Sequence, residues 1–191
     1  MTPLHRFSFS RKIAEQELVQ FKRLLNRHSG TPLRERDHIL PFFRSHRHLA
    51  ALIGTRNSDI ARLDRIAYEF DLFGDYKADL VIGDSENHQY CFVEFEDAAA
   101  TSVFKQTPRA TPDWSPRFEH GFSQIVDWFC HLDDFKKTDR FHRNFGYGHV
   151  DFVGLLLIGR NEGLDDDGIR RLRWRTHHVI VNSHQIGRAH V

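Results

Sequence analysis

The chain has 191 residues, the length of one domain, and 40% of them are hydrophobic, which is enough to form a core. Lysine and arginine (27) nearly balance aspartate and glutamate (26), so the net charge of +1 neither favours nor excludes a nucleic-acid partner. Two isolated cysteines, Cys91 and Cys130, exclude a disulfide framework and a cysteine-rich metal cluster. The longest apolar run, residues 152–158, is far shorter than a membrane helix of about 20 residues. The start lacks a signal core, so we expect a soluble, cytoplasmic protein.

The first 63 residues have the pattern of helices. Apolar side chains in residues 11–28 recur at helical spacing, and Ser29-Gly30-Thr31-Pro32 predicts a stop followed by a turn. A second helical stretch runs to Gly54, and Pro41 is expected to kink or split it. Residues 57–59 can cap a short helix that reaches about Leu63. We therefore assign residues 1–63 to an N-terminal helical segment.

The pattern changes to strands from residue 65. Residues 65–73, 77–83 and 89–96 are strand-like, with a polar turn at 84–88 and a loop at 97–115. We expect the first of these strands to direct Ile66, Tyr68, Phe70 and Leu72 to one side. A helix with a clean apolar stripe begins at Pro116, and residues 150–158 predict a strand covered on both faces. A helix opening at Leu164 and a short strand at 178–181 follow. This order predicts an α/β fold: a mixed sheet with helices on both faces.

The final six residues are unusual. Ile186-Gly187-Arg188-Ala189-His190-Val191 matches the translation of a widely used sequencing-adapter read. We therefore expect the core to span residues 64–185, the natural sequence to end near Gln185, and residues 186–191 to be an artefact that makes few contacts.

The hairpin of residues 78–96 concentrates three carboxylates. If its turn centres between Glu86 and Asn87, Asp79 lies opposite Glu94, and Glu96 follows on the same face. The opposite face is expected to be buried and carries Ala78, Leu80, Ile82, Cys91, Val93 and Phe95. Clustered acids on an apolar hairpin are costly without a counter-ion, and Mg²⁺ or Mn²⁺ prefers such oxygen ligands. The alternative interpretation is a set of surface acids on an edge hairpin with another register.

These segments carry a family resemblance. Ala78-Asp79-Leu80-Val81-Ile82 and Phe92-Val93-Glu94-Phe95-Glu96 resemble the PD-(D/E)XK nuclease motif, and the surrounding residues, about 33–160, resemble the Shedu anti-phage defence nucleases. Further similar features are Asp37-His38-Ile39-Leu40 and Gly121-Phe122-Ser123-Gln124-Ile125-Val126-Asp127-Trp128. Gln124 and Trp128 look like the Gln-x-x-x-Tyr element of related nucleases, with tryptophan replacing tyrosine. The resemblance implies a restriction-endonuclease-like core, Asp79 and Glu94 as ligands of Mg²⁺ or Mn²⁺, DNA as the partner, and a homo-oligomer.

The sequence departs from this pattern at Glu96, where the family has a lysine. Glutamate can bind a metal or accept a proton, but it cannot supply a cationic amine to a developing phosphorane. Either Glu96 is a third ligand and the cation comes from Lys77, Lys105 or Arg117, or the site is weakened and only binds. Lys77 is the favoured cation because it lies two residues before Asp79 on the same face. We expect a metal-dependent DNA endonuclease, and the alternative is a nuclease-fold module that binds nucleic acid or a protein without cutting.

Other clusters have simpler alternatives. The histidine pairs in His46-Arg47-His48 and His177-His178 lack partners at zinc spacing. His120, one turn before Gln124, could carry protons or be an ordinary helix residue. Residues 170–175, Arg-Arg-Leu-Arg-Trp-Arg, could hold phosphates or form a solvated helix end. Whether Glu69 or Asp71 joins the metal site is open.

Overall fold

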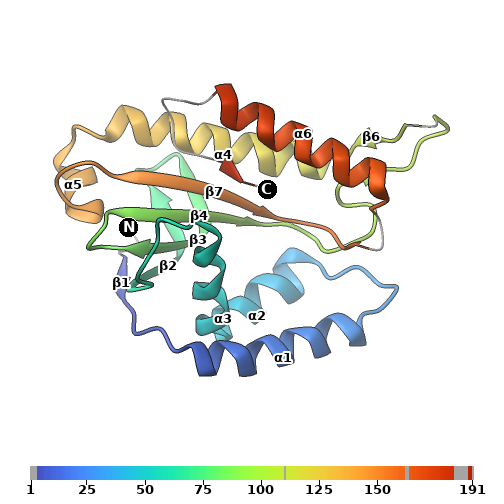
Figure 1. The fold of residues 1–191 in the computed structure, drawn as a ribbon, viewed down its shortest axis with the longest axis horizontal. Helices are drawn as coiled ribbons and strands as arrows, with labels where there is room; N and C mark the ends of the chain where they lie inside the picture. Colours follow the sequence, from blue (N-terminus) through green and yellow to red (C-terminus); the bar gives the residue numbers. More distant parts are fainter. Residues whose placement is uncertain (1–3, 110, 162–163, 183–188, 191) are drawn as a thin grey trace.

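A six-stranded sheet lies between two layers of helices (Figure 1). The computed structural model describes residues 4–109, 111–161, 164–182 and 189–190, with side chains as far as residue 175. The strand order is β1-β2-β3-β4-β7-β8, antiparallel from β1 to β4 and parallel from β4 to β8. The strands are β1 (His5–Arg6), β2 (Arg65–Leu72), β3 (Tyr76–Asp84), β4 (Gln89–Phe95), β7 (Asp151–Leu157) and β8 (Ala189–His190). A separate two-stranded sheet joins β5 (Phe104–Lys105) to β6 (Asp113–Trp114).

The helices divide between the two faces of the sheet. The N-terminal elements α1 (Arg11–Arg27), η1 (Glu35–Ile39), α2 (Leu40–Ser45), α3 (Arg47–Leu52) and η2 (Ile53–Arg56) cover one face. The other face is covered by α4 (Pro116–Phe135) and α6 (Asp166–Asn182), and α5 (Asp139–Phe145) lies at one end. This arrangement confirms the expected α/β class and mixed sheet. No helix in the described part of the chain is both long and apolar enough to cross a membrane.

The hairpin β3–β4 has the register expected from the sequence. Leu80 pairs with Val93, Val81 with Phe92 and Ile82 with Cys91. Both strands are central in the sheet, and α4 packs over Val81 and Phe92. On the opposite face, the side chains under the N-terminal helices are fully buried: Leu80, Ile82, Cys91, Val93 and Phe95.

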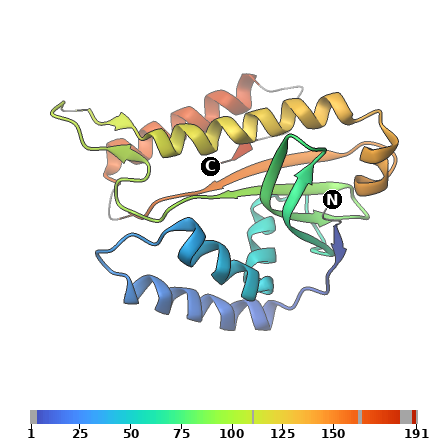
Figure 2. The same cartoon turned by 180° about the vertical axis from the view of Figure 1, so that it is seen from behind.

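A kink in β2 alters which side chains face which layer. Glu69 has φ +47°, in the left-handed region, and it interrupts the pairing between Tyr68↔Leu80 and Phe70↔Ala78. As a result Ile66 packs under the N-terminal helices, whereas Phe70 and Leu72 pack on the α4 side. The expectation that all four apolar residues of β2 share one side is therefore wrong. Ala78 was expected on the same face as Leu80, but it packs on the α4 side. The twisted β2–β3 ribbon curls toward α4 in Figure 2.

Three other local expectations need correction. Residues 57–64 form a turn and a loop instead of a short helix: the Asn57 side chain accepts from the amide of Asp59, and Asp84 accepts from the amides of Ala61 and Arg62. Residues 178–181 belong to α6, so the last strand predicted there is wrong. Ala189 and His190 pair with β7, so these two make more contact than expected, while 186–188 and 191 lie outside the described residues.

Gly154 controls how closely α4 approaches β7. A Cβ atom at this position would overlap Ile125 Cγ2 and lie 3.0 Å from Phe129 Cζ. We predict that Gly154→Ala lowers the free energy of unfolding by about 1–3 kcal/mol through overpacking. Urea denaturation measures this. Combining it with Ile125→Ala should cost less than the sum of the single changes, because the alanine makes room; strictly additive losses would contradict this packing account.

Candidate functional site

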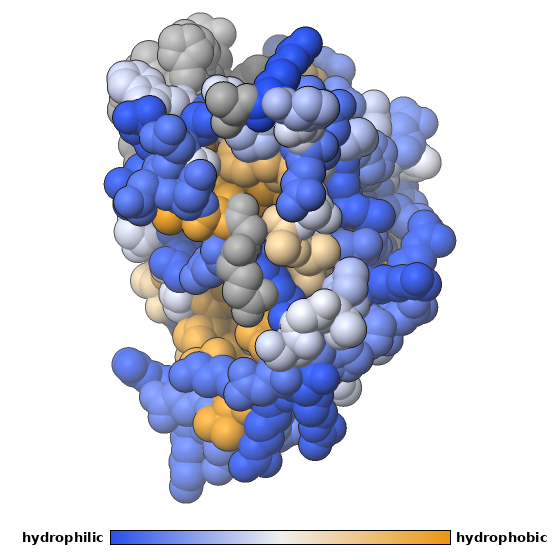
Figure 3. Space-filling model, turned by 90° about the vertical axis from the view of Figure 1, so that its right-hand side faces the viewer, coloured by the Kyte–Doolittle hydropathy of each residue, from blue (hydrophilic) through white to orange (hydrophobic). Residues whose placement is uncertain are grey.

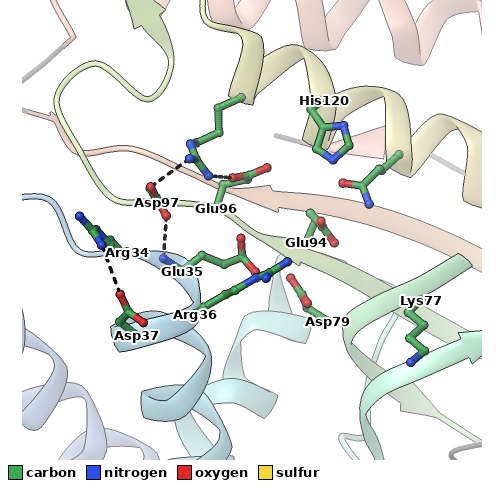
Figure 4. Close-up of a pocket in the computed structure, with 12 residues that line it drawn as sticks. Arg34, Glu35, Arg36, Asp37, Lys77, Asp79, Glu94, Glu96, Asp97 and His120 are labelled. Atoms are coloured by element: carbon green, nitrogen blue, oxygen red, sulfur yellow. Dashed lines mark hydrogen bonds and ion pairs between the residues drawn. The ribbon is translucent and has the colours of Figure 1, made fainter.

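The register of the β3–β4 hairpin brings the predicted site residues to one cavity. A cavity of about 690 Å³ opens where η1, the ends of β3 and β4, and the first turns of α4 meet (Figure 4). Its lining holds six carboxylates and four lysine or arginine side chains: Arg34, Glu35, Arg36, Asp37, Lys77, Asp79, Glu94, Glu96, Asp97, Arg117, His120 and Gln124. The predicted catalytic residues all line this cavity: Asp79, Glu94, Glu96, Lys77 and Gln124. A polar cavity of this kind suits a charged ligand.

Asp79 and Glu94 form a carboxyl pair. The two side chains lie beside each other in the cavity lining, close enough for Asp79 to raise the pKa of Glu94, and Asp79 Oδ2 accepts the amide of Phe95 at 2.9 Å. Burial raises the pKa of Asp79 to about 6, with Glu96 adding to the rise and the Phe95 amide opposing it. Burial, followed by the neighbouring Asp79 and Glu96, raises the pKa of Glu94 to about 9. At neutral pH the pair therefore holds a proton, which a cation could replace.

Glu96 has a different partner from the other two acids. Its carboxylate is nearly fully buried and binds Arg117 Nη1 at 2.8 Å, while Arg117 Nη2 lies 3.2 Å from Asp97 Oδ2. Arg117 is on the first turn of α4, so it links that helix to the end of β4. Among the described residues no three His, Cys, Asp or Glu side chains are grouped closely enough to enclose a metal ion. Glu96 is engaged by Arg117 here, and its expected role as a third metal ligand stays a prediction.

The N-terminal segment contributes groups that sequence reasoning missed. Leu33 and Ala98 form a two-hydrogen-bond bridge, and Glu35 N donates to Asp97 Oδ1 at 2.7 Å. These bonds hold η1, a π-helix, against the end of β4, so that Glu35 faces the carboxyl pair (Figure 4). Burial, then Asp79 and Glu96, raise the pKa of Glu35. The only sequence signal for Glu35 was its position two residues before Asp37-His38-Ile39-Leu40, within the region that resembles the family.

The remaining residues predicted from the sequence differ in their position relative to the cavity. Gln124 lines it, and its buried Oε1 has no hydrogen-bond partner within the described part of the chain. His120 lies one turn earlier on the same helix and also lines the cavity. Lys77 sits at the rim, and its amine points away from Asp79 and Glu94 (Figure 4). Lys105 is elsewhere, 3.7 Å from Asp113 on the small sheet.

A second cavity adjoins the first near the end of β4. It measures about 760 Å³, shares Glu96 with the first cavity, and has apolar side chains from α1, α2 and β4, including Phe21, Phe43 and Phe95. Figure 3 shows hydrophobic side chains in the hollows of an otherwise polar surface at the right-hand end of the molecule as drawn in Figure 1. The acidic cavity, with its charged lining, is the better candidate for chemistry.

The other clusters serve the fold. His48 accepts from the amide of Ser10, and His46 stacks on Phe42. The side chains of His177 and His178 lie outside the described residues. Glu69 pairs with Arg44 at 3.1 Å and Asp71 with Arg140 at 3.6 Å; neither lines the cavity.

The basic stretch at residues 170–175 lies inside α6 instead of at its end, and two of its arginines bind within the protein. Arg175 binds Glu119 through two hydrogen bonds of 2.7 and 2.6 Å, and its guanidinium lies over three aromatic rings. Arg171 donates to the Pro112 carbonyl and lies over Phe104 and Trp114. These two arginines therefore pack α6 against α4 and the small sheet.

The carboxyl pair gives the metal-free protein a pH-dependent stability. Because both pKa values are raised above their ordinary values of 3.8 and 4.5, the neutral forms stabilise the fold at low pH. That contribution is lost as the pH rises through about 6 and then about 9. We predict that the free energy of unfolding in EDTA falls between about pH 5 and pH 9 more steeply in the wild type than in Glu94→Gln. Glu15→Gln, at an exposed site of α1, is the control; identical pH profiles for wild type and Glu94→Gln would contradict the pairing.

Comparison with known proteins identifies the family. The family model described as "Shedu protein SduA, C-terminal" matches residues 33–186, which is most of the chain and contains every residue of the cavity. No curated protein and no solved structure matches the chain. The matched region begins at the Leu33 bridge and includes both strands of the carboxyl pair. The chain therefore belongs to the Shedu SduA C-terminal family, and it is a defence-related Shedu protein.

Proposed function

We propose that this Shedu protein is a PD-(D/E)XK-type nuclease that cleaves DNA with Mg²⁺ or Mn²⁺ in anti-phage defence. The observation that carries the proposal is the carboxyl pair, Asp79 and Glu94, side by side at the bottom of an open polar cavity. Two raised pKa values in a cleft are typical of functional sites. A structural role does not require two acids to face each other there, since opposed acids destabilise a sheet.

The side chains fit a small divalent cation. Mg²⁺ commonly takes one or two protein carboxylates, several water molecules and substrate phosphate oxygens, so Asp79 and Glu94 suffice without a third protein ligand. When bound, such an ion lowers the pKa of a water molecule and neutralises charge on the phosphodiester. Asp79 and Glu94 would lose their shared proton on binding it.

The surrounding residues have supporting roles in this proposal. Glu96 holds Arg117 in place through the 2.8 Å ion pair, which keeps one positive charge at the cavity wall. Gln124 presents an unpartnered amide oxygen that can orient a water molecule. His120, close to Gln124 on α4, is placed to carry a proton.

A second candidate function is a module that binds nucleic acid or a protein without cutting. Two observations favour it: Glu96 occupies the position of the family lysine, and its carboxylate is neutralised by Arg117. In that case the cavity would recognise a ligand without reacting with it.

The nuclease proposal predicts that isosteric changes in the carboxyl pair remove cleavage. Asp79→Asn and Glu94→Gln should each lower the rate of DNA cleavage about 100-fold or more, because charge stabilisation at the phosphate is lost. Both variants should stay folded, since each replaces a carboxyl group by an uncharged amide of similar shape in a pair whose like charges oppose each other. The measurement is a cleavage assay with Mg²⁺, with Mn²⁺ and with EDTA, together with Mn²⁺ titration calorimetry.

Glu15→Gln on the outer surface of α1 serves as the matched control and should cleave at the wild-type rate. A wild-type protein that neither cleaves DNA nor binds Mn²⁺ would reject the nuclease and leave the binding module.

A further inference from the structure

The cavity has a charge problem if its ligand is a phosphodiester. Six carboxylates line it against four lysine or arginine side chains, so even with a bound divalent cation the lining has no excess positive charge for an approaching phosphate. A lysine at position 96 would relieve this, but Glu96 adds a further acid. A cation at the mouth of the cavity is therefore needed on electrostatic grounds.

Three of the four cations are poorly placed for that role. Arg117 is already bound to Glu96 and Asp97, at 2.8 and 3.2 Å. Arg34 lies 3.8 Å from Asp37, away from the carboxyl pair in Figure 4. The amine of Lys77 points out of the cavity in the same view.

Arg36 is different. Figure 4 shows its side chain extending across the cavity, with the guanidinium directed toward Asp79 and close to the carboxylate of Glu35. It is exposed, and within the described ranges no carboxylate oxygen lies within ion-pair distance of it. Its charge still acts on the site, because it opposes the rise in the Glu35 pKa. The guanidinium is therefore available to a ligand.

The backbone that carries Arg36 is firmly placed. The Leu33–Ala98 bridge and the Glu35–Asp97 hydrogen bond anchor the start of η1, and Ile39 is buried at its end. The segment η1 is a π-helix. Such wide helical turns are rare in proteins, and those that occur often lie at functional sites. A planar guanidinium binds two phosphate oxygens at once, which fixes both position and charge.

We propose that Arg36 is a phosphate-binding residue of this site: its guanidinium receives the non-bridging oxygens of the phosphodiester beside Asp79 and Glu94, and it supplies the positive charge that position 96 lacks. The inference deepens the proposed nuclease function and rests on it for the identity of the ligand as DNA. Arg117 remains the counter-ion of Glu96 and Asp97.

The test separates phosphate binding from cleavage. Binding of a fluorescein-labelled DNA duplex of about 20 base pairs in Mg²⁺ is measured by anisotropy in the Asp79→Asn background, where cleavage cannot interfere. Arg36→Ala should weaken binding roughly tenfold to a hundredfold, as expected for a lost charge-assisted contact. Arg36→Lys should recover part of the loss, because it restores charge without the planar fork. Mn²⁺ binding by the otherwise wild-type protein should be unchanged by Arg36→Ala.

Arg23→Ala is the matched control, because it removes the same charge from an exposed position of α1 outside this cavity. Equal, small effects of Arg36→Ala and Arg23→Ala on DNA binding and on the single-turnover cleavage rate would overturn the role of Arg36 while leaving the nuclease intact. Absence of DNA binding by the parent protein would overturn it as well. Loss of binding in Arg36→Ala without any wild-type cleavage would support Arg36 and reject the nuclease.

Discussion

The contact between Asp79 and Glu94 is the constraint around which the site is organised. Two carboxyl groups are placed side by side at the end of the central hairpin, where burial raises the pKa of both. Their opposition follows from the β3–β4 register, which the apolar packing on both faces fixes, because a slip of one residue would expose a buried face. The same packing that stabilises the fold therefore enforces an electrostatic cost, which a shared proton or a cation relieves.

The site is assembled from parts far apart in the sequence. The N-terminal segment reaches the end of β4 through the Leu33–Ala98 bridge, and Arg117 at the start of α4 binds Glu96 and Asp97 at the same point. Asp97 is the shared element, since it accepts the Glu35 amide and pairs with Arg117. A change in the N-terminal segment, in β4 or in the start of α4 would therefore move site groups that the other two contribute.

Much of the core was predictable, because alternation and the hairpin turn determine which side chains of β3 and β4 face each other. The helices α1 and α4 were predictable from their apolar stripes, whereas the length of α6 was not. Two features were missed because their signals are local. The helix α5 is capped by Thr138, whose hydroxyl accepts the amide of Phe141, and the β2 kink places Glu69, which is not glycine, in the left-handed region. Arg117 was named among possible cations, but only tertiary packing shows that Glu96 binds it. The positions of Glu35 and Arg36 depend on long-range bonds to β4, which no periodicity encodes.

The proposed nuclease requires that the carboxyl pair exchange its proton for a divalent cation. The most direct measurement is anomalous diffraction from crystals of the protein soaked in Mn²⁺ near neutral pH. We expect one strong peak, bonded to a carboxylate oxygen of Asp79 and to a carboxylate oxygen of Glu94. An absence of manganese at this position would contradict the exchange.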